Sequence, residues 1–346
     1  MKITDLIIQE IPDGNQGGVL VVNISLDREH RHGYIEKDGF LFGKIFRYKG
    51  AIKDAIYFDS KLSFDDVEYI NQHGLNKVIL DFRYEEATDL SFLCNIEKLE
   101  FLDIYGTIDA SLIDSLANLR FLRVNSSTSI NLGKFPNLEW ISSYTPNQLV
   151  GFEELKNLKS ASLLGGNELC SQKILDIVGS VPTIDTLVLE RSVMRDLSFI
   201  RGVPNLQVLI LKENARLSNL RDLENNNKSL KCLKIIRTTK IDSYSEIGEV
   251  LSLEFLYIDN CRAISSISFI NNLKNLKGAV IAKTNILDGN LSPLMNLDYG
   301  VAIPIKKHYY SIQNGIHSHI KLEQYSSREI EHGNQNIDLW RKIDTW

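Results

Sequence analysis

The amino-acid sequence predicts an α/β solenoid, a horseshoe in which short strand-and-turn repeats stack and their strands form one curved parallel β-sheet. Three observations predict this class. An apolar pattern with one polar residue at a fixed offset recurs along most of the chain. Each copy holds a single strand-length apolar run, which cannot bury its face alone. With 346 residues, of which 43% are hydrophobic, the chain is long enough to form a large core.

The repeat is clearest in "NLQVLILKENARL", residues 205–217, where three leucines precede Asn214. Written as L-x-x-L-x-L-x-x-N-x-L, the pattern recurs at spacings of 19 to 26 residues. Ile184 fills the first leucine position in one copy, and a degenerate copy, "KDAIYFDSK", begins at Lys53. The other copies begin at Leu75, Leu99, Leu119, Leu138, Leu158, Leu206, Leu230, Leu253, Leu276 and Leu297. So regular a period predicts about twelve repeats.

The fixed asparagine has a physical role in this arrangement. In "Leu-x-Leu" two side chains lie on one face of a strand, and neighbouring copies must stack to bury that face. The tight turn after each strand leaves backbone N–H and C=O groups inside, where a short polar side chain can bond to them. The same position holds Asn214, Cys261, Thr107, Ser127, Ser192, Thr238 and Thr284. Gly166 and Pro146 depart from the rule, so we expect irregular turns there.

The period and consensus resemble the leucine-rich repeat family. The return segments "TDLSFLCNIEKL", "RDLSFIRGVPNL", "SSISFINNLKNL" and "DGNLSPLMNL" are similar to short bacterial internalin-type and phosphatase-regulator-type repeats. The resemblance covers roughly residues 50–300 and implies brief 3₁₀ or irregular turns between the strands. Two wider gaps leave room for a helix in "SQKILDIVGSV" and for a second in "LSNLRDLENNN".

The two ends depart from the period. We predict an N-terminal β-cap over residues 1–50, repeats over 51–300, and a C-terminal cap or tail over 301–346. "VLVVNISL" and "YIEKDGFLFGKIFRY" have the residue types of strands. Trp340 and Trp346 either close the last repeat or belong to a loosely ordered end. No Gly/Ser-rich or Pro-rich linker separates the parts, which favours one domain with two caps.

Composition argues against several classes of function. The 39 Lys and Arg residues against 44 Asp and Glu give a net charge of −5, with no basic stretch, so we expect no nucleic acid partner. No run of about 18 apolar residues is present, so we expect no membrane span. The N-terminus does not resemble a secretory signal, and the four cysteines are scattered. These features favour reduced thiols and a cytoplasmic location, although a mature secreted form would also lack a signal.

The sequence shows no catalytic constellation. The "HRH" and "HSH" pairs, residues 30–32 and 317–319, lack the further ligands that zinc or copper requires, so we expect no metal and no cofactor. Cys232 faces outward beside Lys234 without a histidine in adjacent repeats, so we interpret it as a partly exposed, inert thiol. Nucleotide-binding, hydrolase and zinc-protease motifs are absent. We therefore expect no enzyme.

The concave face is the candidate binding surface. Residues between and just after the core leucines point away from the core, and aromatic side chains there are typical of interface hot spots. The alternative is that aromatics on adjacent strands pack on one another. The candidate partner-binding residues are Tyr57, Asp59, Asp81, Phe101, Asp103, Tyr105, Phe121, Arg123, Trp140, Tyr144, Glu190, Arg191, Lys212, Lys234, Tyr257 and Asp259.

Along this face aspartates in the early repeats give way to lysines and arginines later, which suits a folded protein of opposite polarity. We therefore expect a non-enzymatic module that occupies a partner protein through its concave face, first as an inhibitor or immunity-type protein. Regulatory or scaffolding subunits are the alternative. A surface adhesin resembling internalins is a further one.

Overall fold

The structure is a computed structural model that describes residues 19–23, 34–37, 40–43, 55–58, 64–72, 74, 76–82, 91–226, 228–313 and 316–319. Asp59, Trp340 and Trp346 lie outside these residues, and so do the side chains of Tyr57 and Asp81. The chain forms two compact units, unit 1 over Met1–Ala161 and unit 2 over Ser162–Trp346. Each unit is described by itself.

Every predicted copy of the repeat forms a strand, and each strand begins two residues after the first consensus position. The period therefore predicted both the number and the placement of these strands. They are β4 (Ala55–Phe58), β5 (Lys77–Phe82), β6 (Phe101–Gly106), β7 (Phe121–Asn125), β9 (Trp140–Ser143), β11 (Ser160–Leu164), β12 (Thr186–Glu190), β13 (Val208–Lys212), β14 (Cys232–Ile236), β15 (Phe255–Asp259), β16 (Gly278–Ala282) and β17 (Tyr299–Ile303).

In unit 1, β5, β6, β7 and β9 pair in parallel, and β4 also lies parallel to β5. The predicted N-terminal β-segments form β1 (Val19–Asn23), which pairs in parallel with β4 and β5, and the antiparallel pair β2 (Tyr34–Lys37) and β3 (Phe40–Gly43). β3 in turn pairs antiparallel with β4, so these strands extend the repeat sheet. The short strands β8 (Ile130–Asn131) and β10 (Leu149–Val150) pair with each other in the return segments.

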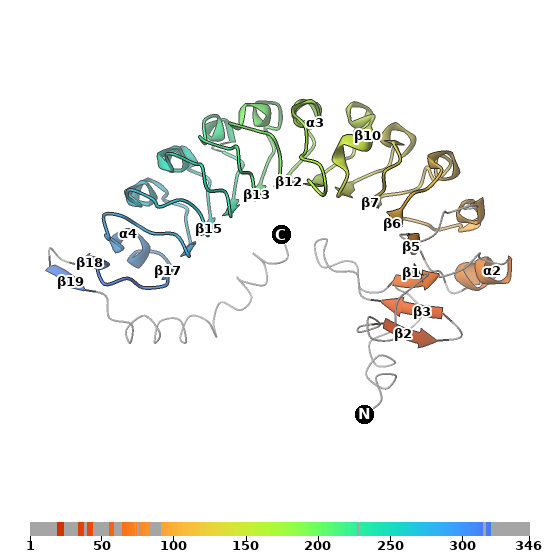
Figure 1. The fold of residues 1–346 in the computed structure, drawn as a ribbon, viewed down its shortest axis with the longest axis horizontal. Helices are drawn as coiled ribbons and strands as arrows, with labels where there is room; N and C mark the ends of the chain where they lie inside the picture. The colour runs from red at the N-terminus through yellow and green to blue at the C-terminus, as the bar shows by residue number, and fades with distance from the viewer. Residues whose placement is uncertain are drawn as a thin grey trace. The chain divides into compact units, whose positions relative to one another are not determined.

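In unit 2, β12 to β17 form a continuous parallel sheet in which the consensus leucines are in register. Leu187, Leu209, Leu233 and Leu256 occupy one row, and all of them are buried. Figure 1 shows the strands of unit 2 along one side of the repeats, with the short helical segments along the other. The core lies between these two layers, because each strand turns its consensus leucines towards the helical segments.

The return segments are mostly single 3₁₀ turns, as the resemblance implied. They comprise η2 (Ser91–Asn95), η3 (Ala110–Leu112), η4 (Leu132–Lys134), η5 (Pro146–Gln148), η6 (Phe152–Glu154), η7 (Ser198–Gly202), η8 (Leu223–Asn226), η9 (Ser245–Glu249) and η10 (Ser268–Asn272). The α-helices are α2 (Phe64–Gln72), α3 (Gln172–Val178) and the one-turn α4 (Ser292–Met295). The helix predicted in "SQKILDIVGSV" is therefore present as α3. "LSNLRDLENNN" holds only η8, because its asparagines favour turns over helix.

Asn214 links neighbouring repeats as predicted. Its Oδ1 accepts hydrogen bonds from the Ser192 N–H (2.9 Å) and hydroxyl (2.8 Å), and its Nδ2 donates to the Leu189 carbonyl (2.9 Å). The Thr238 hydroxyl accepts from the Asn214 N–H, and the Thr284 hydroxyl accepts from that of Cys261. This row of side chains therefore provides hydrogen-bond partners for backbone N–H and C=O groups of the turns in unit 2.

The corresponding prediction for Thr107 and Ser127 in unit 1 is wrong. Both residues are exposed, and the buried hydroxyls belong to Ser126 and Ser143, which accept from the N–H groups of Thr128 and Thr145. In these copies, serine hydroxyls at the end of the strand or directly after it therefore hydrogen-bond to the N–H group two residues further on.

The two positions that depart from the consensus do have different turns. Pro146 begins η5 directly, since proline at the first helical position needs no N–H donor. The Gly166 carbonyl accepts from the Arg191 guanidinium.

After β17 the chain forms the antiparallel pair β18 (Tyr310–Gln313) and β19 (Ile316–His319). Tyr309, which is 1% exposed, continues the turn interactions beyond the last consensus copy. Its hydroxyl accepts from the Ile286 N–H at 3.1 Å, and His308 Nε2 lies 2.9 Å from the Ile286 carbonyl. This aromatic pair therefore bonds to backbone two residues beyond Thr284, the consensus polar position of the preceding repeat.

Candidate functional site

The open face of the sheet, which is the face opposite the core, carries the predicted binding residues. In unit 1 the strand register places Phe101, Phe121 and Trp140 in one row. Asp103, Arg123 and Ser142 form the next row. Tyr105 and Tyr144 follow on the same face, because side chains two residues apart share a face of a strand. The structure thus brings the predicted residues of β6, β7 and β9 together.

The first row is an aromatic stack. The rings of Phe101 and Trp140 are 6.5 Å apart at an interplanar angle of 24°, and the Arg120 guanidinium lies 5.2 Å from the centre of the Phe121 ring. Phe101 is fully buried and Trp140 is 6% exposed. The prediction that these two side chains face solvent is therefore wrong, because aromatic side chains along one row of the sheet cover one another.

The second row is a buried ion pair. Arg123 Nη1 lies 3.0 Å from Asp103 Oδ2 and donates to the Tyr105 hydroxyl at 3.2 Å. Asp103 is fully buried, so its predicted role as a solvent-facing aspartate is also wrong. Burial opposes the charge of Arg123, but Asp103 and Tyr105 together outweigh it, and the pKa of Arg123 is raised. Burial, and then Asp103, raise the pKa of Tyr105 to about 12, so its hydroxyl keeps its proton.

The accessible part of this surface is narrower than the sequence predicted. Tyr105, Phe121 and Arg123 are half-buried, and Tyr144 is 39% exposed. We define these four residues as the aromatic–arginine surface. They present tyrosine, phenylalanine and a fixed guanidinium to solvent, whereas Phe101, Asp103 and Trp140 lie beside them in the same rows and are buried.

In unit 2 the predicted open-face residues lie mainly in paired interactions. Lys212 Nζ bonds to Glu190 Oε2 at 2.8 Å, and Arg191 donates to the Gly166 carbonyl. Lys234 is 7% exposed, so its prediction as a solvent-facing cation is wrong. It lies in register between Ile210 and Tyr257 on adjacent strands, whose side chains flank its aliphatic stem.

The remaining predicted residues lie near the C-terminal end of this sheet. Tyr257 packs against an apolar cluster of Val280, Tyr299 and Val301, and Asp259 is half-buried. The open face of unit 2 is therefore mainly apolar at this end, where Tyr257 packs against the cluster.

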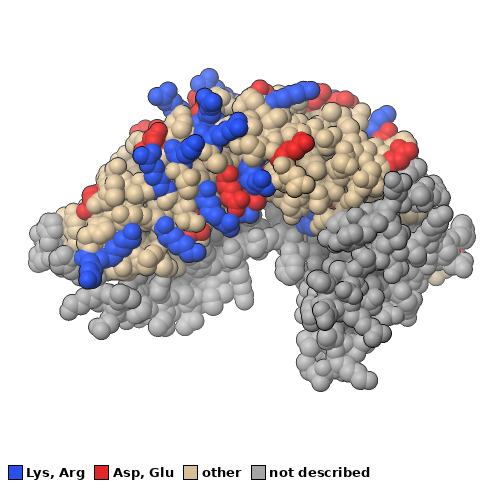
Figure 2. All heavy atoms as spheres, in the orientation of Figure 1, with Lys and Arg blue, Asp and Glu red and all other residues tan. Residues whose placement is uncertain are grey.

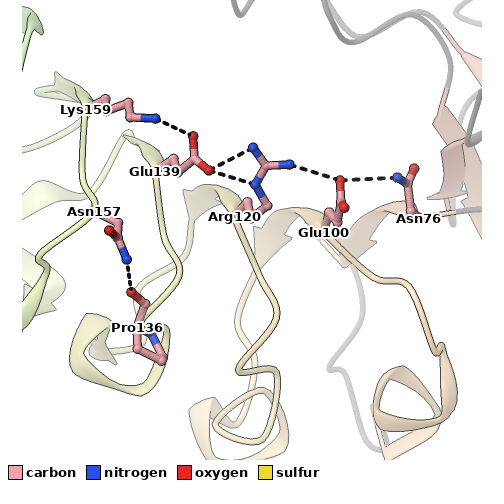
Figure 3. Close-up of polar contacts among 7 residues, drawn as sticks. All are labelled: Asn76, Glu100, Arg120, Pro136, Glu139, Asn157 and Lys159. Atoms are coloured by element: carbon pink, nitrogen blue, oxygen red, sulfur yellow. Dashed lines mark hydrogen bonds and ion pairs between the residues drawn. The ribbon is translucent and has the colours of Figure 1, made fainter.

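One polar feature was not found from the sequence. In unit 1 the residue directly before each strand forms a ladder along the sheet edge (Figure 3). Arg120 lies 2.8 Å from Glu139 and 3.7 Å from Glu100. Lys159 lies 3.1 Å from Glu139, and Asn76 donates to Glu100. These side chains, with Asn118, Asn137 and Asn157, line a groove of ≈ 590 Å³.

A signal for the ladder is present in the sequence, as alternating charge sign at the position after the first consensus leucine. Asn137 and Asn157 add a second row, in which each amide donates to a backbone carbonyl of the preceding repeat. Because the charged groups pair with one another, we interpret the ladder as a feature that stabilises repeat stacking.

The cysteines have the properties of unreactive thiols. Burial raises the pKa of Cys170 to about 12 and that of Cys232 to about 11. Cys232 is buried between Val208 and Phe255, so the prediction of partial exposure is wrong. Within the described ranges the structure contains no group of three His, Cys, Asp or Glu side chains suited to a metal ion. Nor does that part of the chain contain a helix long and apolar enough to cross a membrane.

The arrangement of the strands, the turns and the return segments identifies the fold. Consensus leucines lie in register on parallel strands, each followed by a polar turn and a short return segment. This is the leucine-rich repeat fold. No protein-family model matches the sequence, and no curated relative does.

Several solved structures are similar to the chain. An internalin (inlF) of Listeria monocytogenes is 17% identical, with 72% of this chain and 82% of that chain covered and a TM-score of 0.47. Internalin C2 (inlC2) of the same organism is 21% identical, with coverages of 56% and 82% and a TM-score of 0.42. The plant peptide hormone receptor RGFR1, in complex with RGF2, is 16% identical, with coverages of 68% and 41% and a TM-score of 0.44.

Proposed function

We propose that this chain is a non-enzymatic module that binds a folded protein through the aromatic–arginine surface of unit 1. The observation that carries the proposal is the position of Arg123. Its guanidinium is held by Asp103 and Tyr105, and lies among Phe121 and Tyr144 on the open face. Arginine and tyrosine side chains are the residue types that dominate protein–protein hot spots.

The buried support favours binding energetically. A free arginine side chain loses rotamer freedom when it binds, at a cost of about 0.5–1.5 kcal/mol. Arg123 is already fixed by its ion pair with Asp103 at 3.0 Å. In the neighbouring row, the ring of Trp140 is fixed by stacking on that of Phe101. Such a surface is formed before the partner arrives, so less of the interaction free energy is lost in ordering it.

We further propose that binding inhibits the partner, as an immunity-type protein does, because covering a functional surface requires nothing beyond the surface itself. We place the protein in the cytoplasm, where an exposed free thiol such as Cys94 remains reduced. Both proposals rest on the binding role.

The test is affinity capture from a native lysate with the wild-type chain and with a Tyr144→Ala variant. We expect one stoichiometric partner that the variant retains poorly, and loss of that partner's activity when the wild-type chain is titrated in. Capture with full partner activity would favour a scaffolding subunit over an inhibitor. Equal capture by both chains would move the binding surface away from unit 1.

A further inference from the structure

The loops that follow β12 to β17 in unit 2 are rich in basic residues. They span residues 191–197, 213–220, 237–243, 260–266, 283–291 and 304–310, and we call them the basic edge. The basic edge holds nine Lys or Arg against four Asp or Glu, although the whole chain has a net charge of −5. Figure 2 shows many Lys and Arg side chains over unit 2 on the visible face. The charge of the chain is therefore unevenly distributed.

The basic edge is not a general property of this fold. The three matching loops of unit 1 that the structure describes, residues 107–112, 126–130 and 144–149, hold no Lys or Arg and are rich in Ser and Thr. Where Figure 2 shows described residues of unit 1, they are mostly neither basic nor acidic. The two sets of loops have the same position relative to their strands, so the difference lies in the side chains and not in the backbone architecture.

Several cations of the basic edge are available to a partner. Arg237 pairs with Glu213 at 2.6 Å, and Arg262 pairs with Asp242. In contrast, five exposed side chains form no ion pair or hydrogen bond within the described part of the chain. These are Arg195, Arg216, Lys240, Lys283 and Lys307. They come from the loops after five of the six strands β12 to β17.

The backbone beneath these cations is regular and fixed. The residue after each strand from β12 to β16 has a positive φ, from 48° to 55°, at Arg191, Glu213, Arg237, Asn260 and Lys283. Each of their N–H groups donates to the last carbonyl of the next strand, at 2.6 to 3.0 Å. Of the five available cations, Lys283 occupies this position, and the other four lie three or four residues further along loops that repeat at the spacing of parallel strands, about 4.8 Å per repeat.

We infer that the basic edge binds an extended, acidic segment of a partner protein. The six strands span about 24 Å between the first and last, which an extended chain covers in about seven residues at about 3.3 Å each. Carboxylates on such a segment would meet one available cation in nearly every repeat. This surface is distinct from the aromatic–arginine surface, and the inference does not depend on it.

Charge density favours a peptide over nucleic acid. Asp196, Glu213, Asp242 and Asp288 lie among the cations, and they would repel a continuous phosphate backbone. Duplex DNA carries about one negative charge per 1.7 Å, far more than the mixed charge of the basic edge can neutralise. An acidic peptide can instead place its carboxylates only where the cations are.

The test uses the full chain and a fluorescein-labelled peptide of alternating Glu and Ser, about ten residues long to span the edge. Fluorescence anisotropy near physiological ionic strength measures its affinity for wild type and for an Arg216→Glu/Lys240→Glu variant. The matched control, Lys173→Glu/Lys228→Glu, changes the net charge equally at exposed residues of α3 and of the turn after η8. Thermal melting checks folding, and Arg216→Gln/Lys240→Gln replaces the charge-reversal variant if that variant is unstable.

We expect the peptide to bind wild type, the edge variant to bind at least about tenfold more weakly, and the control to stay within about twofold. An equal loss in the control would overturn the inference, because it would reflect net charge alone. Absence of peptide binding to wild type would overturn it as well. Tighter binding of a single-stranded oligonucleotide of matched length would reassign the edge to nucleic acid.

Discussion

At the scale of single residues, stability depends on which side chains complete the backbone hydrogen bonds of the turns. Asn214 is fully buried, and it accepts from Ser192 and donates to Leu189. Carboxamides can donate and accept at once, so one side chain satisfies groups on two sides of the turn. A threonine hydroxyl, as at Thr238 or Thr284, offers one donor and can complete only part of this set.

We therefore predict that Asn214→Ala lowers the free energy of unfolding by about 1–3 kcal/mol, because it leaves buried turn groups without partners. Asn214→Thr should have a smaller effect. The matched control is Thr107→Ala, at the same consensus position but exposed, for which we expect a change within about 0.5 kcal/mol. Urea denaturation measures all three. Equal losses at Asn214 and Thr107 would contradict the burial-dependent role.

The buried thiols predict a loss of stability at alkaline pH. In the folded chain the pKa of Cys170 is raised to about 12 and that of Cys232 to about 11, from an ordinary value of 9.0. Above pH 9.0 the unfolded chain loses these protons and the folded chain keeps them, so rising pH favours unfolding. Each thiol then contributes a decrease of about 1.4 kcal/mol per pH unit until its folded pKa is reached.

We expect the unfolding free energy, measured by urea titration from pH 8 to about pH 11, to fall less steeply in a Cys170→Ala/Cys232→Ala variant than in wild type. Replacement of the exposed Cys94 by alanine is the control and should leave the slope unchanged. Parallel slopes in all three proteins would show that these thiols do not titrate differently in the folded chain.

At the scale of elements, the turns after β12 to β16 in unit 2 store backbone strain. Lys283 has a φ of 48°, a conformation that costs a residue with a Cβ about 1–2 kcal/mol and glycine little. We predict that Lys283→Gly raises the thermal midpoint, with a gain of about 0.5–1 kcal/mol in stability. Lys231→Gly, directly before β14 and without a positive φ, should lower the midpoint instead. Lower midpoints in both variants would exclude strain relief at Lys283.

The edge ladder of unit 1 predicts a weak but measurable coupling between strands. Arg120 and Glu139 form the shortest ion pair of the ladder, at 2.8 Å, and the Arg120 side chain is 42% exposed. A double-mutant cycle of Arg120→Ala and Glu139→Ala should give a coupling of about 0.2–1 kcal/mol that weakens as salt is added. Guanidinium is unsuitable as denaturant here because it is itself a salt, so urea should be used. Coupling that persists at high salt would indicate packing of the Arg120 stem rather than charge.

The same elements show how far the sequence can predict this structure. The period located the twelve repeat strands, each of which begins two residues after a first consensus position, because consensus leucines must share a face and a register to be buried. It placed the polar turn residue correctly at Asn214 but not at Thr107, which is exposed, because the period fixes a position in the repeat and not the burial of the side chain there.

The candidate site was predicted less completely. Period-two alternation assigns Phe101 and Trp140 to the open face, and the strand register does bring them into one row. Alternation does not show whether neighbouring side chains cover a residue on that face, which depends on stacking between strands that are not adjacent. The edge ladder was not predicted because the repeat is defined by its apolar positions, whereas the ladder is formed by the charged residues between them.

At the scale of the whole molecule, composition hid two surfaces of different chemistry. The net charge of −5 gives no sign of the basic edge of unit 2. Outside the basic edge, acidic residues outnumber basic ones, and this excess hides the positive charge of the edge. Similarly, an aromatic content of 9% is unremarkable, although Tyr105, Phe121 and Tyr144 are concentrated on one face of unit 1. Charge and aromatic content become informative only when the repeat register distributes them over faces and edges.

That distribution leads to the prediction for partner binding. Tyr144 is the most exposed member of the aromatic–arginine surface, so Tyr144→Ala should weaken the complex by about 2 kcal/mol, or roughly 30-fold, without unfolding the chain. Trp140→Ala should instead lower stability by about 3–5 kcal/mol, because it removes a buried ring from the stack with Phe101. Val150→Ala, at a 45% exposed residue of β10, is the control for both measurements.

Calorimetric titration with the captured partner and urea denaturation separate these effects. A Tyr144→Ala chain that folds normally and binds with wild-type affinity would place the partner elsewhere on the molecule. Reduced affinity in Val150→Ala as well would indicate a general loss of surface area and not a hot spot. We expect neither, because the fixed guanidinium of Arg123 and the neighbouring Tyr144 form the part of the open face where aromatic contact and a charged hydrogen bond are offered together.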